Sequence, residues 1–266
     1  MRQFVSRHRS LIGLLLMALW FPISGGAESI DPKAKEVIES SSKFLSQQKA
    51  YQVETETIAQ FSIQGMKQNV NTQSAMIHES PNKMAMHSTS PLFSLDIISD
   101  GTQIFMYSPQ LKKYTVDPAP PTLQEMNTFI AEKSTPASPL GNSSNAQPLL
   151  FNQDPETIWE TITQATYLGK EEIAGHSTHH LQLWMEETQM DAWYLSGEEP
   201  VLFKIQPDMS SILESMGLPH SESVQLSVQV FYKKWAFNPK LPATVFEFQP
   251  PADAQLVETL FPNPED

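Results

Sequence analysis

The amino-acid sequence predicts a mainly β (α+β) fold: a single antiparallel half-barrel of about 10–11 strands, with an N-terminal helix and short mid-chain helices packed on its concave side. Two observations predict this fold class. Most of the chain after residue 50 alternates apolar and polar residues with a period of two, which is typical of strands with one buried face. Turn residues separate these stretches at short intervals, and the spacing of a helix occurs in only a few places.

Residues 1–27 are predicted to be a cleaved signal peptide outside the fold. Arginines precede an apolar run, residues 11–23, which is shorter than the roughly 20 residues of a membrane-spanning helix, so a membrane anchor is the less favoured alternative. Gly25 and Ala27 are the small residues that a signal peptidase requires. We therefore expect an exported chain that is soluble in the periplasm.

The composition excludes several classes of function. The chain has no cysteine, so it has no disulfide-linked partner, no thiolate metal site and no cysteine nucleophile. Three of the 17 basic residues lie in the signal, which leaves 14 Lys+Arg against 30 Asp+Glu and a net charge of about −16. Such a surface repels nucleic acid and anionic headgroups, so we expect no nucleic-acid partner.

The mature chain is predicted to begin with a helix that ends near residue 48. Asp31 is a suitable N-cap, and Pro32 suits the first helical position. Apolar residues then recur at helical spacing on one face, opposite a polar face. They are Ala34, Val37, Ile38, Phe44 and Leu45.

Strands follow this helix. Residues 51–63 place Tyr51, Val53, Ala59, Phe61 and Ile63 on one side, and Gly65 ends the run. Asp100-Gly101 is the strongest short hairpin signal in the chain. Together with the other turn residues, these breaks predict strands over residues 66–78, 84–88, 92–99, 102–108 and 114–116.

The middle of the chain changes character. Thr122 and Glu125 resemble a capping box that opens a helix ending near residue 132. Residues 134–148 are Ser, Pro, Asn and Gly with almost nothing to bury, so they are expected to be a mobile loop, either disordered or a lid over a site. A second short helix is expected over residues 154–162.

The last third is again predicted to be strands. Residues 224–232 alternate strictly, and a last short strand is expected within 237–248. Nothing in the composition divides the chain, so residues 28–258 are predicted to be one domain, followed by a flexible tail, 259–266. The other expected strands cover residues 165–173, 178–184, 191–195 and 201–205, and residues 208–222 are an insertion before the strand at 224.

The whole chain resembles a known family. The stretch "IISDGTQIFMYSPQLKKYTV" is similar to a hairpin of the periplasmic carriers of outer-membrane lipoproteins. A closer resemblance is to a family of predicted bacterial periplasmic proteins of uncharacterised function. It rests on "DPKAKEVI", on residues 167–169 with His179-His180-Leu181, and on residues 235–254, and it covers most of residues 31–257. The resemblance implies an eleven-strand half-barrel around an apolar cavity. The carriers hold cargo with a cavity arginine, and this chain has no arginine after residue 9.

Aromatic and methionine side chains in the predicted strands are the candidate ligand-binding residues. Methionine suits a pocket for varied acyl chains because its thioether stem is flexible and polarizable. For each residue the alternative is ordinary core packing. The candidates to line the cavity are Phe61, Met84, Met86, Phe105, Trp193 and Phe203.

The stretch "GHSTHH" holds three histidines, but its predicted hairpin separates them. His176 is expected in or beside the turn, and neighbours on a strand point to opposite faces. His179 would share the core side of Leu181, and His180 would face outward. We therefore predict no metal site, with an exposed pair of His176 and His180 as the weak alternative.

No catalytic or phosphate-binding motif occurs, and no cofactor is expected. The sequence favours a periplasmic, non-enzymatic binding or carrier protein that holds a lipid, a lipoprotein acyl chain or another hydrophobic ligand. Its partners would be lipid or lipidated protein cargo, and an envelope membrane protein is a further candidate. An envelope sensor that binds a membrane-bound protein partner is the alternative function. A hydrolase with an unrecognised site is less favoured.

Overall fold

The computed structural model describes residues 30–63, 65–91, 93–133, 149, 157–185, 188–215, 217 and 224–261. The expected signal peptide (1–27), the expected loop (134–148) and the start of the expected 154–162 helix lie outside the described residues. None of the helices in these ranges is long and apolar enough to cross a membrane.

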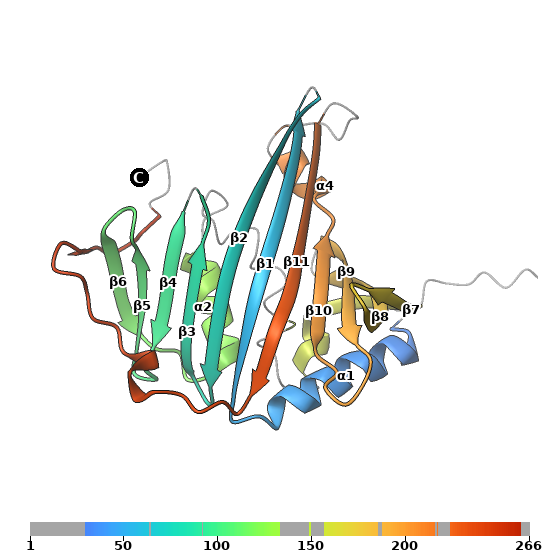
Figure 1. The fold of residues 1–266 in the computed structure, drawn as a ribbon, viewed down its shortest axis with the longest axis horizontal. Coiled ribbons are helices and arrows are strands. Elements are labelled where there is room, and N and C mark those ends of the chain that lie inside the picture. The colour runs from blue at the N-terminus through green and yellow to red at the C-terminus, as the bar shows by residue number, and fades with distance from the viewer. Residues whose placement is uncertain are drawn as a thin grey trace, which may run out of the picture.

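The described strands form one sheet (Figure 1). Its order is β12-β6-β5-β4-β3-β2-β1-β11-β10-β9-β8-β7, and every neighbouring pair is antiparallel except β12 with β6. The strands are β1 Ala50–Ile63, β2 Met66–Glu79, β3 Lys83–Thr89, β4 Ser94–Ser99, β5 Gln103–Ser108, β6 Lys113–Pro118, β7 Ile162–Ile173, β8 His176–Met185, β9 Thr188–Leu195, β10 Leu202–Pro207, β11 Val224–Phe237 and β12 Gln255–Leu256.

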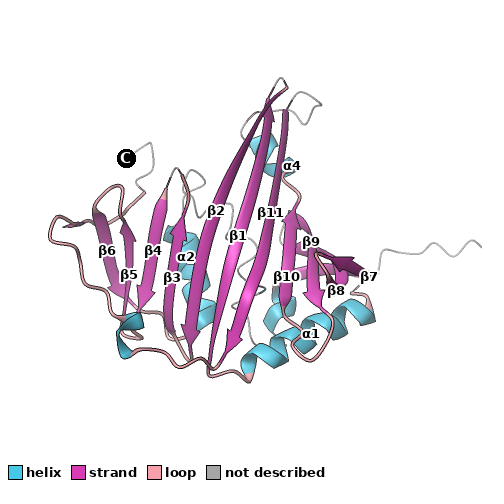
Figure 2. Cartoon of the chain, viewed as in Figure 1, coloured by secondary structure: helices cyan, strands magenta, loops and turns pink. Residues whose placement is uncertain are grey.

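The helices are few and short (Figure 2). They are α1 Pro32–Ser46, α2 Leu123–Lys133, the single-turn α4 Ser210–Ser215, and the 3-10 turns η2 Thr157–Glu160 and η3 Ala243–Phe246. The predicted fold class is therefore confirmed: a mainly β, open sheet with an N-terminal helix and short mid-chain helices.

The two faces of the sheet are covered differently. We call the face that carries Val53, Met84 and Leu181 the inner face, and the face that carries Phe105 and Trp193 the outer face. The inner face and the apolar sides of α1 and α2 belong to one hydrophobic cluster. The helices therefore pack on the inner face, and the core lies between them and the sheet.

Local chemistry fixes the start of α1 as the sequence predicts. The Asp31 side chain accepts a hydrogen bond from the Lys33 backbone N–H at 2.7 Å, and Pro32 is the first helical residue. The backbone N–H of Asp31 also donates to the carbonyl of Ala165 at 2.8 Å. This second bond ties the helix to β7.

The Asp100-Gly101 hairpin is confirmed between β4 and β5. Asp100 Oδ1 accepts from the backbone N–H groups of Thr102 and Gln103 at 2.7 and 2.8 Å. Gly101 has φ +94°, and a Cβ there would lie 3.2 Å from Asn82 Oδ1. Glycine at this position avoids both the strained φ and the close contact.

The expectation of a last strand within residues 237–248 is wrong. β11 extends to Phe237, and the chain then runs as an irregular segment with the 3-10 turn η3. Pro239 and Pro242 lack the N–H donors that a strand ladder needs, which accounts for the difference. The final strand is β12, which was not predicted and pairs in parallel with β6.

The two ends of the sheet differ: β7 forms one edge, and the start of the C-terminal tail packs near the other. β7 is one end of the sheet, and its pairing with β8 is irregular between Tyr167 and Gly169. At the other end, the start of the expected 259–266 tail packs on the fold: Leu260 is buried and the Phe261 ring lies 5.6 Å from that of Phe93.

Candidate functional site

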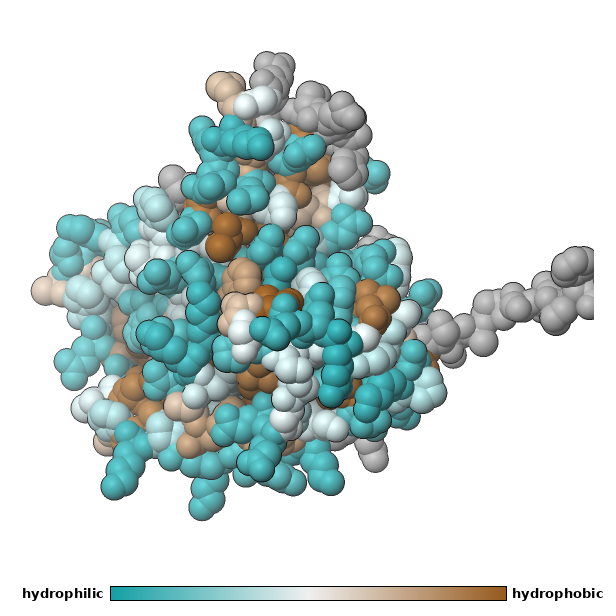
Figure 3. Space-filling view, turned by 45° about the vertical axis from the view of Figure 1, so that its right-hand side comes forward, coloured by the Kyte–Doolittle hydropathy of each residue, from teal (hydrophilic) through white to brown (hydrophobic). Residues whose placement is uncertain are grey.

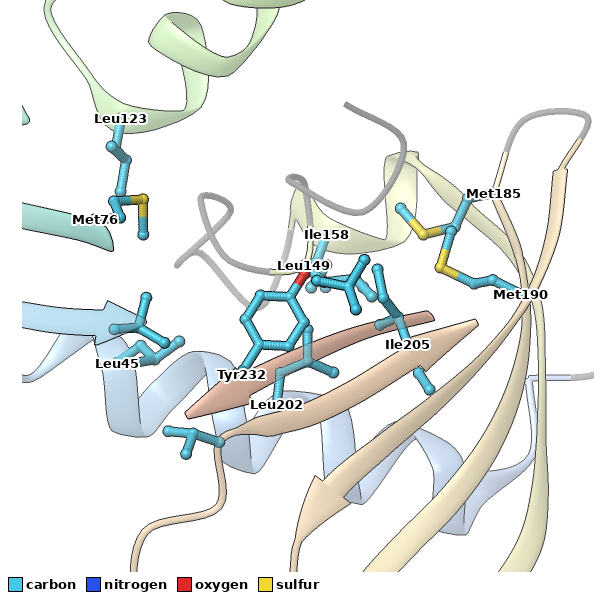
Figure 4. Packing of buried hydrophobic residues seen from close by; sticks show 14 of the residues in the cluster. Leu45, Met76, Leu123, Leu149, Ile158, Met185, Met190, Leu202, Ile205 and Tyr232 are labelled. Atoms are coloured by element: carbon cyan, nitrogen blue, oxygen red, sulfur yellow. The ribbon is translucent and has the colours of Figure 1, made fainter. Parts of the chain in front are cut away.

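The inner face is rich in methionine. Eight of the chain's 12 methionines are buried in the hydrophobic cluster, and they come from strands, from α2 and from the segment after β10. Figure 4 shows Met76 beside Leu123 of α2, and Met185 beside Met190. The eight are Met76, Met84, Met86, Met106, Met126, Met185, Met190 and Met209.

Three polar side chains interrupt this apolar interior. Both ring nitrogens of His78, Thr115 Oγ1 and Asn127 Oδ1 are buried and make no hydrogen bond of good geometry to any residue that the structure describes. Buried polar groups are normally paired, so each of these atoms could accept or donate a bond to a bound molecule.

His78 is held neutral. Burial lowers its pKa to about 4, against smaller opposing effects of the Pro81 carbonyl and the Glu79 carboxylate. Its ring lies 5.1 Å from that of Tyr51 on the inner face. At neutral pH the interior therefore gains no charge from this residue.

The predicted lining residues are divided between the two faces. Met84 and Met86 are buried side by side on the inner face of β3. Phe61 also lies on the inner side, but at the far end of β1, where it is 39% exposed. The structure does not bring the other three to them, because Phe105, Trp193 and Phe203 lie on the outer face.

Each of these outer residues has a packing partner of its own. The Phe105 ring lies 5.1 Å from Phe248, and Phe203 contacts Phe231 edge-on at 6.4 Å. Trp193 stacks on His180 at 4.4 Å, with the Lys204 ammonium 4.3 Å from the centre of its ring.

Charged groups complete the Trp193 cluster. The indole N–H donates to Glu171, and the His180 ring lies 3.0 Å from Asp191 and 3.4 Å from Glu171. Burial lowers the pKa of Lys204, and the negative charges of Glu171 and Asp191 partly offset this shift. These groups satisfy one another, so the cluster stabilises the outer surface of β8–β10.

The histidines of "GHSTHH" are separated as predicted. The chain turns at Ala174-Gly175, His176 is exposed against Phe203, and His180 faces outward. His179 lies on the inner side with Leu181 but is only half buried, with Nδ1 at 3.0 Å from the Tyr167 hydroxyl. Burial, with Lys170 and Lys33, lowers its pKa. Among the described residues no group of three or more potential ligands could hold a metal ion.

The sequence analysis singled out the methionines of the predicted strands, but not His78, Met126 or Met209. The signal was present: His78 is two residues after Met76, and strand alternation puts both on one face. Thr115 and Asn127 carried no comparable signal, because polar residues are common in strands and helices that face solvent.

Comparisons with known proteins give the following. The sequence matches no curated protein at a significant level. Among solved structures, LprF from Mycobacterium bovis matches with a TM-score of 0.42 and 10% identity over 85% of this chain and 99% of that one. Lipoprotein LppX from Mycobacterium tuberculosis matches with a TM-score of 0.39 and 11% identity over 79% and 98%. A LolA superfamily protein from Nitrosomonas europaea matches with a TM-score of 0.34 and 11% identity over 81% and 97%. A family model described as "Predicted periplasmic protein (DUF2092)" matches residues 34–260.

Proposed function

The chain belongs to the DUF2092 family of predicted periplasmic proteins, and from this premise we propose that it is a non-enzymatic periplasmic protein that binds a hydrophobic ligand against its inner face. The ligand would be a lipid or the acyl chain of a lipidated protein. The observation that carries the proposal is the set of eight methionines in one buried cluster.

Methionine makes the interior deformable. Its side chain is unbranched, with three rotatable bonds, and can refill space as a ligand enters or leaves. A core that needed only to be rigid would favour branched side chains with well-defined rotamers. The methionines also lie on both sides of the interior, since Met126 belongs to α2 and Met84 to the sheet.

The unpaired polar atoms suit an amphiphilic ligand. The oxygens of a fatty acyl ester or acid can accept from His78 or Thr115, the O–H of a protonated acid can donate to Asn127 Oδ1, and the acyl chain can pack among the methionines. A ligand that pairs one of these atoms recovers part of the cost of burying it, about 1–3 kcal/mol per group.

Helix α2 is the element that we propose to move. It buries only Leu123, Met126 and Ile130, and its last turn is joined to β6 by the Lys133–Asp117 ion pair at 3.0 Å. A short helix with so few buried side chains can separate from the sheet at low cost.

Native purification with lipid extraction and mass spectrometry tests the proposal. We expect lipid to co-purify in stoichiometric amount with the mature protein. Absence of lipid, together with no binding of a fluorescent fatty acid, contradicts it. In that case a membrane protein recovered by crosslinking in cell envelopes would favour the sensor alternative.

Methyl NMR locates the ligand. In mature protein with labelled methionine methyls, oleate should shift the signals of buried methionines, with Met84→Leu and Met86→Leu supplying assignments. Met66, which is 70% exposed at the turn between β1 and β2, is the internal control. Shifts confined to Met66 would place the ligand outside the inner face.

A further inference from the structure

The chain after β11 forms a strap across the outer face, and it creates a groove that the proposed function does not use. Residues 243–257, here called the C-terminal strap, pass the ends of β3–β5 and reach β6 (Figure 1). Phe248 anchors the strap: its ring lies 5.1 Å from Phe105, 5.8 Å from Tyr107 and 5.6 Å from Tyr114.

The strap is fixed again beyond Phe248. Lys112 forms an ion pair with Asp253 at 2.6 Å, and its carbonyl accepts from the Gln255 N–H at 2.9 Å. Two attachment points therefore hold the segment between them over the strands.

An open groove of about 410 Å³ lies between the strap and the sheet. This volume is within the range of small-molecule sites, roughly 300–1,000 Å³. β4 and β5 contribute one wall and the strap the other. The residues used below are Asp96, Ile98 and Tyr107 of the sheet, and Glu247, Phe248 and Gln249 of the strap.

The lining is acidic and aromatic. Asp96 and Glu247 both line the groove, and no lysine or arginine does. Asp96 Oδ1 bonds to the His87 ring at 3.0 Å, but the exposed Glu247 side chain has no ion pair or hydrogen bond in the described part of the chain. Tyr107 and Phe248 add two ring systems, and Ile98 adds an apolar contact.

The nearby cations are engaged elsewhere. The Lys112 ammonium pairs with Asp253, and Lys83 lies 5.7 Å from the Phe246 ring and 3.0 Å from Glu79. Neither lysine therefore neutralises the carboxylates that line the groove.

We propose that this groove binds a small organic ammonium ion, whose charge faces the carboxylates of Asp96 and Glu247 and whose alkyl groups pack on Tyr107 and Phe248. Aromatic faces attract alkylammonium ions through the ring quadrupole, and carboxylates add a charge-assisted contact. An inorganic cation would have to lose tightly held water to reach the aromatic walls, whereas an alkylammonium ion packs on them directly, which is why an organic cation is the fitting class. The proposal is independent of ligand binding on the inner face.

Choline and its neutral isostere 3,3-dimethylbutan-1-ol test the proposal, with binding followed by amide NMR of the mature protein. The two have the same shape and differ in charge. We expect choline to shift the signals of residues 96–98, 107 and 247–249, and to bind about tenfold more tightly than the alcohol. Equal binding of both, or no shifts at these residues, overturns the proposal.

Variants separate charge from packing. Asp96→Asn with Glu247→Gln should weaken choline binding by about tenfold and leave binding of the alcohol unchanged. Asparagine preserves a bond acceptor for His87, so the fold should remain. Glu258→Gln, an exposed carboxylate just beyond the strap, is the matched control and should change nothing. Undiminished choline binding by the double variant would refute the role of the carboxylates.

Discussion

His78 couples the stability of the fold to pH. The unfolded chain takes up a proton at this residue near pH 6.5, but the folded chain does so only near pH 4. Between these values the unfolded state binds more protons, so the free energy of unfolding falls as the pH falls. His87 acts in the opposite sense, because its hydrogen bond to Asp96 raises its pKa.

Replacement of His78 tests this coupling. The shift of about 2.5 pH units corresponds to about 3 kcal/mol of stability lost between pH 6.5 and pH 4, and His78→Phe should remove that loss. Urea unfolding at a series of pH values measures the slope. His176→Gln, at an exposed position, is the control and should keep the slope of the unmodified chain. An equal slope in His78→Phe would show that burial of His78 does not set the acid sensitivity.

Replacement of Trp193 tests how much the cluster around this residue on the outer face contributes to the free energy of unfolding. Its ring is 6% exposed between His180 and Lys204, so Trp193→Ala should cost about 3–5 kcal/mol of unfolding free energy. Trp184→Ala, on the same face but 37% exposed, should cost clearly less. Urea unfolding distinguishes the two, and equal losses would contradict a packing role specific to Trp193.

At the scale of elements, the start of α1 carries the clearest local signal. Asp31 caps the helix and its backbone N–H bonds to β7, so Asp31→Ala removes only the side-chain bond. We expect a loss of about 1 kcal/mol in thermal or urea unfolding. Ser46→Ala, exposed in the last turn, should change stability by less than about 0.5 kcal/mol. A loss as large in Ser46→Ala would refute the capping role.

Elements fixed by neighbouring residues could be predicted from the sequence. The Asp31-Pro32 start, the Asp100-Gly101 hairpin and the alternation of β11 each depend on a few consecutive residues. β12 could not be predicted, because its two residues have no strand character of their own and pair only with the distant β6.

The predicted lining residues were not all placed on one face, and the physical reason is the same. Alternation shows which residues share a face, but not what covers that face. Ile98 and Phe105 are apolar on the outer side because the strap covers them, and the strap comes about 140 residues later in the chain. Phe105 was therefore predicted to line the same cavity as Met84 and Met86, although those two residues lie on the other face of the sheet.

At the scale of the molecule, two meanders are joined at one ladder. β1–β6 and β7–β11 are each built from strands that follow one another, and β1 pairs with β11 from Tyr51–Phe237 to Ile63–Val224. The three central strands are β1, β11 and β2, which pairs with β1 on its other side. Each has 14 residues, and together they project beyond their neighbours (Figure 1). The face of the molecule seen in Figure 3 is mostly hydrophilic, with small separate apolar patches.

This arrangement predicts a gradient of hydrogen exchange. Amides of β1 that are paired on both sides, such as those near Thr57, should exchange only through global unfolding, because both meanders must separate to free them. Amides of β12, exposed at the sheet end, should exchange much faster. Comparable protection of the two strands, measured by exchange NMR, would contradict the gradient.

The irregular edge of β7 has a consequence for an exported chain at high concentration. Leu168 is extra relative to β8 and 51% exposed, and Lys170 and Glu172 follow it. A bulge and charges on a terminal strand prevent another chain from adding in register. The β7 end of the sheet therefore resists edge-to-edge aggregation and fibril growth. An apolar, unbroken strand at the same place would favour both.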